Sequence, residues 1–507
     1  MASHLGLLKP IKTHRVNQGK GDAKEEEKEE PLSPLARLFH APQVNCFIVV
    51  VFGCKTTIDV DVFKHGLEQT LIKHPRFSSK LAFDTGKVAE PLKWVRTVVN
   101  IDDHVIVPDL DPNIESPDQF VEDYASNITK TPMDLSKPLW ELHILNVETS
   151  EAASIGIFRV HHSLGDGVSI ISLLLACMGK ASDANAFPSL VANKKKANDP
   201  CTKSHPWFLG FVFTLMSMLK VFWNTLMDVT LFLATIICLK DDKNPLKGGI
   251  GIEKTPRRFV HRMLNLNDIK LVKNAMGVTV NDVALGITQS GLSRYLYERC
   301  GEAKGDKMDS ESSMLSHSRI RATLFVNLRP TTVVQDVANV INAGSNVGAD
   351  WGNKIGYILC PLHIKLRDDP LDYIYDVKAA IDQKKRSLVA QFTYFTTSLL
   401  LKTLGLQAAV MIMYKSLSNT TLSFSNVAGP MEEVSLFGHP MVFFAPSIYG
   451  FPQALVIHFQ SYMDKMAVIL SVDEDVIPDP HKLCFEIEKS LMLAKNAVME
   501  NKLANKL

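Results

Sequence analysis

Short apolar runs alternate with amphipathic segments along most of this chain. Side chains in a strand alternate between two faces, whereas a helix repeats about every 3.6 residues. These patterns predict alternating strands and helices in both halves, which favours an α/β (α+β) layered fold with helices packed on sheets. The predicted strands are Asn45–Phe52, Pro91–Asn100, Trp140–Val147, Ser154–Val160 and Arg257–Leu266; the predicted helices are Asp61–Lys73, Asp118–Lys130, Val168–Ala176, Asp268–Asn274 and a helix from Thr279 to about Tyr297.

Residues 206–239 consist mostly of Leu, Phe, Met, Val and Trp, and as one helix they would extend roughly 50 Å. Lys220, Asn224 and Asp228 interrupt the stretch at four-residue spacing, which places them on one helical face. The longest uncharged piece, 206–219, is shorter than the ~20 residues that a membrane-spanning helix needs. We therefore expect an amphipathic or re-entrant helix on a membrane surface. The alternative is a lid helix packed on the protein.

Lysines flank both ends of residues 206–239, so the positive-inside rule keeps both ends on the cytosolic side. A single crossing would also separate the two halves of the chain. A second apolar run, Gln391–Tyr414, is interrupted only by Lys402. Taken alone it could be a membrane span, but a buried or tunnel-lining helix is favoured. The charge run Lys24–Glu30 predicts a disordered tail over residues 1–30. The polar residues 301–318 predict a surface loop.

Composition narrows the classes of function. The chain has 507 residues, of which 46% are hydrophobic and 21% charged, enough for two packed domains. Its formal net charge of +1 gives no electrostatic reason to expect a nucleic-acid partner. The eight cysteines include no Cys-x-x-Cys pair, a pattern typical of a reduced, intracellular protein. A Gly-x-Ser-x-Gly nucleophile motif is also absent from the sequence, which disfavours a covalent acyl-enzyme.

The most specific chemical signal is His161-His162-Ser163-Leu164-Gly165-Asp166-Gly167, between a predicted strand and a predicted helix. A neutral histidine can accept a proton from a hydroxyl at cellular pH. Neighbouring side chains on a strand point to opposite faces, so one histidine should face a reaction chamber and the other the interior. That geometry disfavours a shared metal ion. Asp166 can cap the following helix, and Gly165 and Gly167 permit backbone angles that other residues resist. The simpler alternative is a buried, hydrogen-bonded histidine beside a helix cap.

This segment matches the HHxxxDG motif of acyl-CoA-dependent acyltransferases and condensation domains. In detail the chain resembles plant-type bifunctional wax ester synthase/diacylglycerol acyltransferases over roughly residues 31 to 500. Five further blocks carry the resemblance in the expected order: Pro138-Leu139-Trp140-Glu141, Asn281-Asp282-Val283, Asn327-Leu328-Arg329-Pro330, Gly352-Asn353-Lys354-Ile355-Gly356 and Ser425-Asn426-Val427-Ala428-Gly429-Pro430. Asn281 and Asp282 also admit a plainer interpretation, because Thr279 and Asp282 resemble a capping box that starts a helix.

The resemblance implies two similar domains of the chloramphenicol-acetyltransferase-like type, with the active site between them. The expected boundaries are 31–195 for the first domain, 196–255 for a linker with the membrane-associating segment, and 256–500 for the second domain. His162 would be the general base of a direct acyl transfer, with His161 and Asp166 in support and Arg329 as a candidate cation for Asp166. Gly167, Asn281 and Asn426 are candidates for substrate binding.

By the same resemblance, the substrates are long-chain acyl-CoA, fatty alcohol and, as a lesser acceptor, diacylglycerol. Acyl-CoA is a substrate, so no cofactor is expected, and no metal. The expected location is the endoplasmic reticulum membrane with a cytosolic catalytic body, and also the plasma membrane.

Three alternatives stay open at this point. A soluble plant acyltransferase for phenolic or amine acceptors would carry a late Asp-Phe-Gly-Trp-Gly block, which this sequence lacks. A condensation-type domain would use carrier-bound thioesters, and no carrier domain accompanies this one. A catalytically inert lipid-binding relative would share the fold, but the intact HHSLGDG motif argues against inertness.

Overall fold

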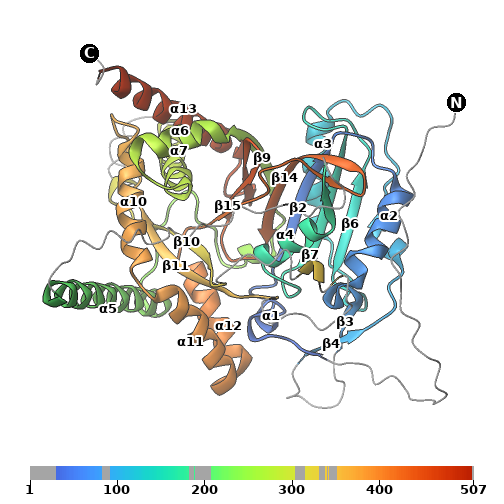
Figure 1. Cartoon of the computed structure of the whole chain (residues 1–507), viewed down its shortest axis with the longest axis horizontal. Helices are drawn as coiled ribbons and strands as arrows, with labels where there is room; N and C mark the ends of the chain where they lie inside the picture. The colour runs from blue at the N-terminus through green and yellow to red at the C-terminus, as the bar shows by residue number, and fades with distance from the viewer. Residues whose placement is uncertain are drawn as a thin grey trace.

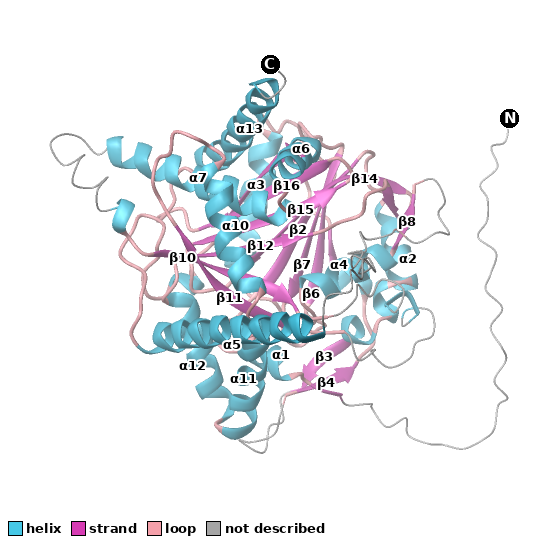
Figure 2. Ribbon diagram, turned by 60° about the vertical axis from the view of Figure 1, so that its left-hand side comes forward, coloured by secondary structure: helices cyan, strands magenta, loops and turns pink. Residues whose placement is uncertain are grey.

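The computed structural model describes residues 30–82, 92–181, 188, 207–302, 315–329, 337–339, 341 and 351–504. The expected disordered tail lies outside the described residues except for Glu30, and so does most of the expected loop 301–318. Within the described part, two large sheets stand side by side and carry helices on their faces (Figure 1, Figure 2). The layered α/β architecture predicted from the sequence is therefore confirmed.

Seven strands form the sheet of the N-terminal half, in the order β5-β6-β7-β2-β14-β13-β8. Every residue of β2 and β7 is buried, as expected for central strands with continuous apolar sequences. The strands are β2 (Phe47–Cys54), β5 (Val105–Ile106), β6 (Trp140–Leu145), β7 (Ser154–His161), β8 (Met178–Lys180), β13 (Val434–Leu436) and β14 (His439–Tyr449). The helices of this half are α1 (Pro34–Leu38), α2 (Val60–Gln69), α3 (Pro117–Lys130) and α4 (Gly167–Ala176).

A small separate sheet has the order β1-β4-β3, with β1 (Glu30–Pro31), β3 (Ser79–Ala82) and β4 (Lys93–Arg96). The predicted strand Pro91–Asn100 is therefore shorter than expected. The other strands and helices predicted for this half are present, with ends that differ by a few residues.

Six strands form the sheet of the C-terminal half, in the order β11-β10-β12-β15-β16-β9. They are β9 (Arg258–Asn265), β10 (Ile320–Asn327), β11 (Ile355–Leu362), β12 (Leu422–Val427), β15 (Leu455–Tyr462) and β16 (Lys465–Val472), and α6 (Leu266–Met276), α7 (Val280–Glu302), α10 (Asp372–Lys385) and α13 (Pro480–Ala504) accompany them. The predicted capping box is present at the start of α7. The Asp282 N–H donates to Thr279 Oγ1 at 3.2 Å, and the Thr279 N–H donates to Asp282 Oδ2 at 2.9 Å.

Two strands of the C-terminal half lie in the sheet of the N-terminal half. β13 and β14 follow the C-terminal strand β12 in sequence, yet they lie in the N-terminal sheet, where β14 pairs with β2 from Met441 opposite Cys54 to Tyr449 opposite Phe47. The domain boundaries expected from the sequence assign these two strands to the second domain, 256–500. The N-terminal sheet therefore contains strands from both halves of the chain.

The apolar segment forms one long helix, α5 (Trp207–Ile237), and residues Phe211–Ile237 are long and apolar enough to cross a membrane by composition, with 17% of the most apolar window buried. Of the three polar residues predicted on one face of this helix, Asn224 and Asp228 contact the protein, whereas Lys220 is exposed. Asn224 donates to the Gln383 and Arg386 carbonyls, and Asp228 is buried in an ion pair with Lys384. Every residue from Phe213 to Lys220 is exposed. The exposed surface of α5 is therefore mostly apolar, whereas its buried face combines polar residues with apolar ones such as Phe232.

The second apolar run differs from its prediction. Instead of one buried helix, it forms two helices, α11 (Val389–Thr403) and α12 (Gly405–Ser418), which pack against each other as a hairpin. Gly405 adopts a φ of +81°, which favours glycine and lets the chain turn. Phe395, Leu399 and Met411 are exposed, so the prediction of a buried helix was wrong for the outer faces of this hairpin.

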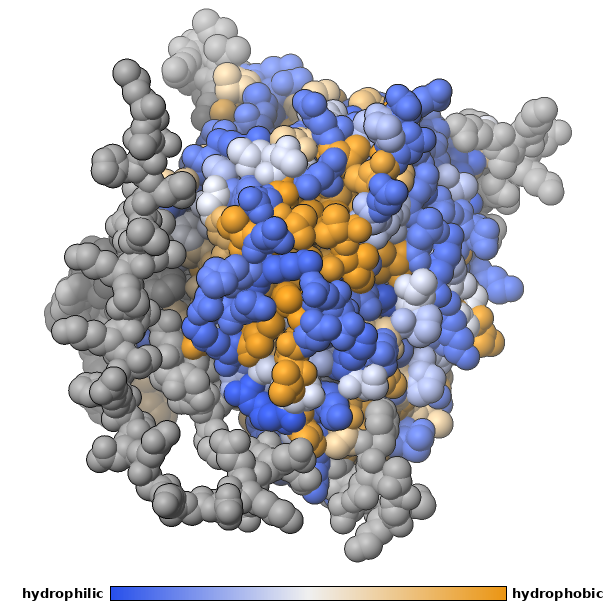
Figure 3. All heavy atoms as spheres, turned by 90° about the vertical axis from the view of Figure 1, so that its right-hand side faces the viewer, coloured by the Kyte–Doolittle hydropathy of each residue, from blue (hydrophilic) through white to orange (hydrophobic). Residues whose placement is uncertain are grey.

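Helix α5 and the hairpin lie next to each other at one side of the molecule in both ribbon views (Figure 1, Figure 2). The opposite end, over the N-terminal half, carries hydrophilic residues around a central band of hydrophobic ones (Figure 3).

Candidate active site

The HHSLGDG segment forms the turn between β7 and α4. Asp166 caps α4, because its Oδ1 accepts a hydrogen bond from the Ser169 N–H at 3.0 Å, which confirms the predicted cap. The turn does not use the backbone freedom of its two glycines, since neither Gly165 nor Gly167 has a positive φ. Close packing explains Gly165, where a Cβ would lie 3.0 Å from that of Ser169, whereas at Gly167 a Cβ would meet open space.

His161 points into the protein interior. Its Nδ1 lies 2.6 Å from Ser163 Oγ, its Nε2 lies 3.0 Å from Asn45 Oδ1, and its ring stacks on His40 at 4.3 Å. Burial, together with the charges that His40 and His162 would carry, lowers the pKa of His161 well below its ordinary value. A neutral, fully hydrogen-bonded ring is suited to holding the turn in place.

His162 faces a cavity between the two halves, as predicted for one member of the pair. Asn353 fixes the protonation of its ring. The Asn353 Nδ2 donates to the His162 carbonyl at 3.0 Å, so its Oδ1 must be the atom 3.0 Å from His162 Nδ1. That nitrogen therefore carries the proton, and Nε2 keeps its lone pair. Burial lowers the pKa of His162, which further favours the neutral ring.

Substitutions of Asn353 test this arrangement through the pH profile. Because a carboxylate beside Nδ1–H stabilises imidazolium, Asn353→Asp should raise the pKa of His162 and move the acidic limb of kcat/KM to higher pH. Asn353→Ala removes a hydrogen bond that raises this pKa, so the limb should move to lower pH and kcat should fall by up to about 10²-fold through misplacement of the ring. The exposed Asn113→Asp is the control. An unchanged profile in Asn353→Asp would contradict the assignment.

Arg329 is the cation that faces Asp166. Its Nη1 lies 2.7 Å from Asp166 Oδ2, and both side chains are almost completely buried, at 1% and 2% exposure. The same carboxylate oxygen accepts the Lys354 N–H at 2.9 Å, and Arg329 also donates to the Gly352 carbonyl. The candidate partner named from the sequence is thus confirmed as a contact. It joins the β7–α4 turn to residues of the C-terminal half.

The cavity in front of His162 has a volume of about 140 Å³ and is lined by strands and helices of both halves. Most of its wall is apolar, with side chains such as Ile48, Ile170, Leu174, Phe325 and Phe444. Its polar side chains are those of His162, Asp166, Asn327, Ser425, Asn426, Ser447, His458 and Gln460.

Two of the three predicted substrate-binding residues, Gly167 and Asn426, line this cavity. The third, Asn281, is not part of its wall. Asn281 Oδ1 lies 3.5 Å from Asn426 Nδ2 and so supports Asn426 from behind. Asp282 is occupied in capping α7.

The sequence-based prediction missed His458 and Ser447. His458 Nδ1, on β15 of the C-terminal sheet, lies 3.3 Å from Ser447 Oγ on β14 of the N-terminal sheet, and His458 is buried in the cavity wall. Burial and the nearby His162 lower the pKa of His458 to about 4, so its ring is neutral. A lone histidine in an apolar strand carries no signal of this position. Asn353, by contrast, belongs to the block Gly352-Asn353-Lys354-Ile355-Gly356, so the family resemblance does carry a signal for this residue.

Comparison with known proteins places this geometry in a family. The model of the wax ester synthase/diacylglycerol acyltransferase catalytic domain matches residues 48–284, and that of the WS/DGAT C-terminal domain matches residues 351–495. Wax ester synthase/diacylglycerol acyltransferase 11 of Arabidopsis thaliana is 47% identical over 96% of this chain and 98% of its own length. Wax ester synthase/diacylglycerol acyltransferase 5 of the same plant is 48% identical over 94% and 95%.

Two solved structures support the fold. A wax ester synthase/diacylglycerol acyltransferase from Marinobacter aquaeolei VT8 has a TM-score of 0.57 at 19% identity, covering 92% of this chain and 99% of that one. The TRI3 trichothecene 15-O-acetyltransferase of Fusarium sporotrichioides has a TM-score of 0.53 at 12% identity, covering 92% and 95%. With the two-domain fold and the extent of the sequence match both established, this chain belongs to the wax ester synthase/diacylglycerol acyltransferase family and is an acyltransferase of the chloramphenicol-acetyltransferase-like fold.

Proposed function

We propose that this acyltransferase esterifies long-chain fatty alcohols and, to a lesser extent, diacylglycerol, with long-chain acyl-CoA as donor. The observation that carries the proposal is the free Nε2 of His162, which faces an apolar cavity between the halves while Asn353 holds Nδ1–H. The names of the relatives include both wax ester synthesis and diacylglycerol acylation. The apolar wall suits lipid substrates more than phenolic or amine acceptors.

In the proposed reaction, His162 Nε2 accepts the proton of the alcohol as its oxygen attacks the thioester carbonyl. The C–S bond of the resulting tetrahedral oxyanion then breaks, and the CoA thiolate takes the proton from Nε2, which leaves an ester and free CoA. Asn426 and His458 line the cavity and are the proposed hydrogen-bond donors to the oxyanion. These steps use acyl-CoA as a substrate and need no cofactor or metal.

The volume of about 140 Å³ is small beside the ~300–1,000 Å³ of typical ligand pockets. We therefore assign the cavity to the reacting ends of the substrates. Their hydrocarbon chains would extend between the two halves.

The test offers labelled palmitoyl-CoA with hexadecanol and diacylglycerol together to membranes from expressing cells. Labelled wax ester as the major product is expected, with less triacylglycerol. Triacylglycerol alone would overturn the acceptor preference, and no neutral lipid at all would favour a lipid-binding relative without activity.

We further propose that α5 holds the protein on the cytosolic face of the endoplasmic reticulum membrane, and also of the plasma membrane. A helix in water turns its polar residues outward. Helix α5 instead turns Asn224 and Asp228 inward and exposes Phe and Met side chains, as suits contact with lipid. A glycan at Asn127, which is exposed and begins an Asn-x-Thr sequon, would overturn the cytosolic orientation.

The part of α5 from Phe211 to Trp223 is called the free half of α5. Introducing negative charges there is expected to release the protein from microsomes. The variant is Phe211→Glu with Phe213→Glu and Phe222→Glu; Phe232 is left intact because it is buried against Tyr357 and Phe392. Each lost burial of a phenylalanine should weaken binding by roughly tenfold or more. The matched control carries Val62→Glu, Val98→Glu and Leu135→Glu, all exposed in the N-terminal half. A fully membrane-bound α5 variant in a flotation assay would contradict the proposal.

A further inference from the structure

We propose that the α11–α12 hairpin is a second membrane contact, which forms with the free half of α5 one docking surface for a bilayer rich in anionic phospholipids. This inference rests on the proposed membrane association of α5 and adds a separate element to it. The hairpin part of the docking surface consists of Phe395, Leu399, Leu404 and Met411.

These four side chains are large, apolar and strongly exposed. Leu404, at the turn between the helices, is 67% exposed, and Phe395 and Leu399 on α11 are 66% and 60% exposed. Phe395 and Leu399 are four residues apart and therefore lie on one helical face. Contiguous exposed apolar patches on a protein mark a surface that meets another apolar phase.

The inner face of α11 carries buried polar residues, as does that of α5, beside apolar ones such as Val389 and Ala390. Thr393 and Thr397 are buried. Thr393 Oγ1 accepts the Tyr357 N–H at 3.1 Å, and Thr397 Oγ1 donates to the Thr393 carbonyl at 2.7 Å. Polar side chains thus satisfy hydrogen bonds inside while apolar ones face outward. Two neighbouring elements with large apolar side chains on their exposed faces point to one common apolar surrounding.

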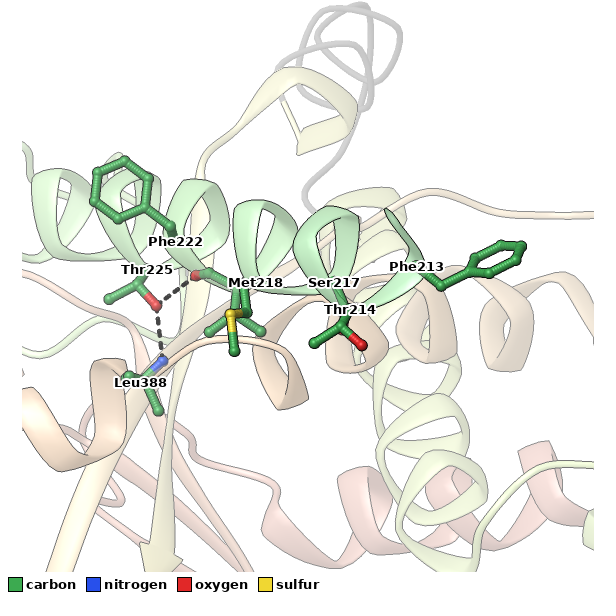
Figure 4. Close-up of a pocket in the computed structure, with 8 residues that line it drawn as sticks. Phe213, Thr214, Ser217, Met218, Phe222, Thr225 and Leu388 are labelled. Carbon is green, nitrogen blue, oxygen red and sulfur yellow. Dashed lines mark hydrogen bonds between the residues drawn. The ribbon is translucent and has the colours of Figure 1, made fainter. Parts of the chain in front are cut away.

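Helix α5 and the hairpin contact each other. The Leu388 N–H, just before α11, donates to Thr225 Oγ1 of α5 at 3.0 Å (Figure 4). Beside this bond an open groove of about 670 Å³ runs along α5, lined by residues that include Met218, Phe222 and Leu388. Figure 4 shows Phe213 and Phe222 extending outward from the helix on either side of the groove. The groove follows α5 and reaches Leu388, at the start of the hairpin.

The charges of this region have one sign. Residues 383–431 contain five basic residues and no aspartate or glutamate. Arg386, Lys402 and Lys415 are exposed there, as is Lys220 on α5, whereas the acidic Asp228 is buried against Lys384. Cations near an anionic membrane each add to its attraction. This pattern favours anionic lipid headgroups over a neutral surface.

A bilayer fits better than a second protein. Residues 213–220 are exposed on all sides of α5, whereas a protein partner would cover one face. The free piece from Phe211 to Trp223 is roughly 20 Å long, shorter than the ~30 Å hydrocarbon core. It therefore enters one leaflet and does not cross the membrane.

Vesicle flotation with the full chain tests the inference. The hairpin variant carries Leu399→Glu, Leu404→Glu and Met411→Glu, and the controls are the α5 variant and the N-terminal triple variant described above. We expect at least tenfold weaker binding of the hairpin variant to phosphatidylcholine vesicles that contain phosphatidylserine, with thermal unfolding and activity in detergent micelles unchanged. Wild type should bind vesicles of phosphatidylcholine alone more weakly, and added salt should weaken its binding to the anionic vesicles.

The outcomes separate this inference from the proposal for α5. Wild-type binding of the hairpin variant, with release of the α5 variant, would overturn the inference and leave the α5 proposal intact. Retention of both variants would overturn both. Equal binding with and without phosphatidylserine, or a wild-type dimer in the absence of lipid, would also overturn the inference. If the triple variant unfolds, Leu404→Glu alone gives the same test at an exposed turn.

Discussion

Replacing His162 with alanine is expected to lower kcat for ester formation by about 10²–10⁴-fold, the usual contribution of a general base. The imidazole is held at Nδ1 by Asn353 and presents Nε2 to the cavity, and alanine offers no atom that can accept the alcohol proton. The measurement is a steady-state assay with labelled palmitoyl-CoA and hexadecanol, together with a thermal unfolding curve.

The control is His65→Ala on α2, because this histidine is 73% exposed and does not line the cavity. It should retain wild-type activity. Wild-type turnover in His162→Ala, with an intact fold, would remove His162 from the mechanism. Loss of activity with loss of the fold would be resolved by His162→Gln, which keeps a polar side chain of similar reach but no base.

Breaking the Asp166–Arg329 pair is expected to cost about 3–5 kcal/mol of unfolding free energy, because Asp166→Ala leaves an uncompensated guanidinium in the interior. The protein offers a matched surface pair. Lys64 and Asp102 also lie 2.7 Å apart, but their side chains are 28% and 68% exposed. There, Asp102→Ala should cost only about 0–1 kcal/mol.

Urea unfolding of the two variants measures the contrast. Equal costs at the two sites would contradict the structural role of the buried pair. A double variant, Asp166→Ala with Arg329→Leu, should recover part of the loss, since it leaves no unpaired charge. The pair connects the histidine turn to the C-terminal half, so Asp166→Ala should also lower activity.

Local sequence patterns were sufficient where neighbouring residues determine the structure. The turn at His161–Gly167 follows from a strand pattern, a capping aspartate and a helix pattern in succession, and the box at Thr279 and Asp282 follows from two residues three apart. The opposite orientations of His161 and His162 follow from the two-residue period of a strand. Arg329 was named as a partner of Asp166 only because it lies in a family block.

Contacts between residues that lie far apart in the sequence could not be predicted from local patterns. Asn353 meets His162 across 191 positions of the chain, and no local pattern encodes that contact. His458 sits in an apolar strand whose alternation predicts burial but not a cavity. The hydropathy of residues 391–414 predicts one helix, because an apolar run looks the same with or without a turn inside it. The turn depends on Gly405 alone. Whether an apolar face meets protein or lipid is likewise decided by tertiary packing.

The pairing of β14 with β2 in the N-terminal sheet has a consequence for the synthesis of the chain. In the finished sheet β2, with the sequence FIVVVFGC, lies between β7 and β14. On the ribosome β7 emerges soon after β2, but β14 ends only at Tyr449, on the order of 20–80 s later at ordinary translation rates. Throughout that interval one edge of a strongly apolar strand has no native partner, and such edges recruit other chains. We therefore expect chaperones to matter most during synthesis, after β2 has emerged from the ribosome and before β14 has been made.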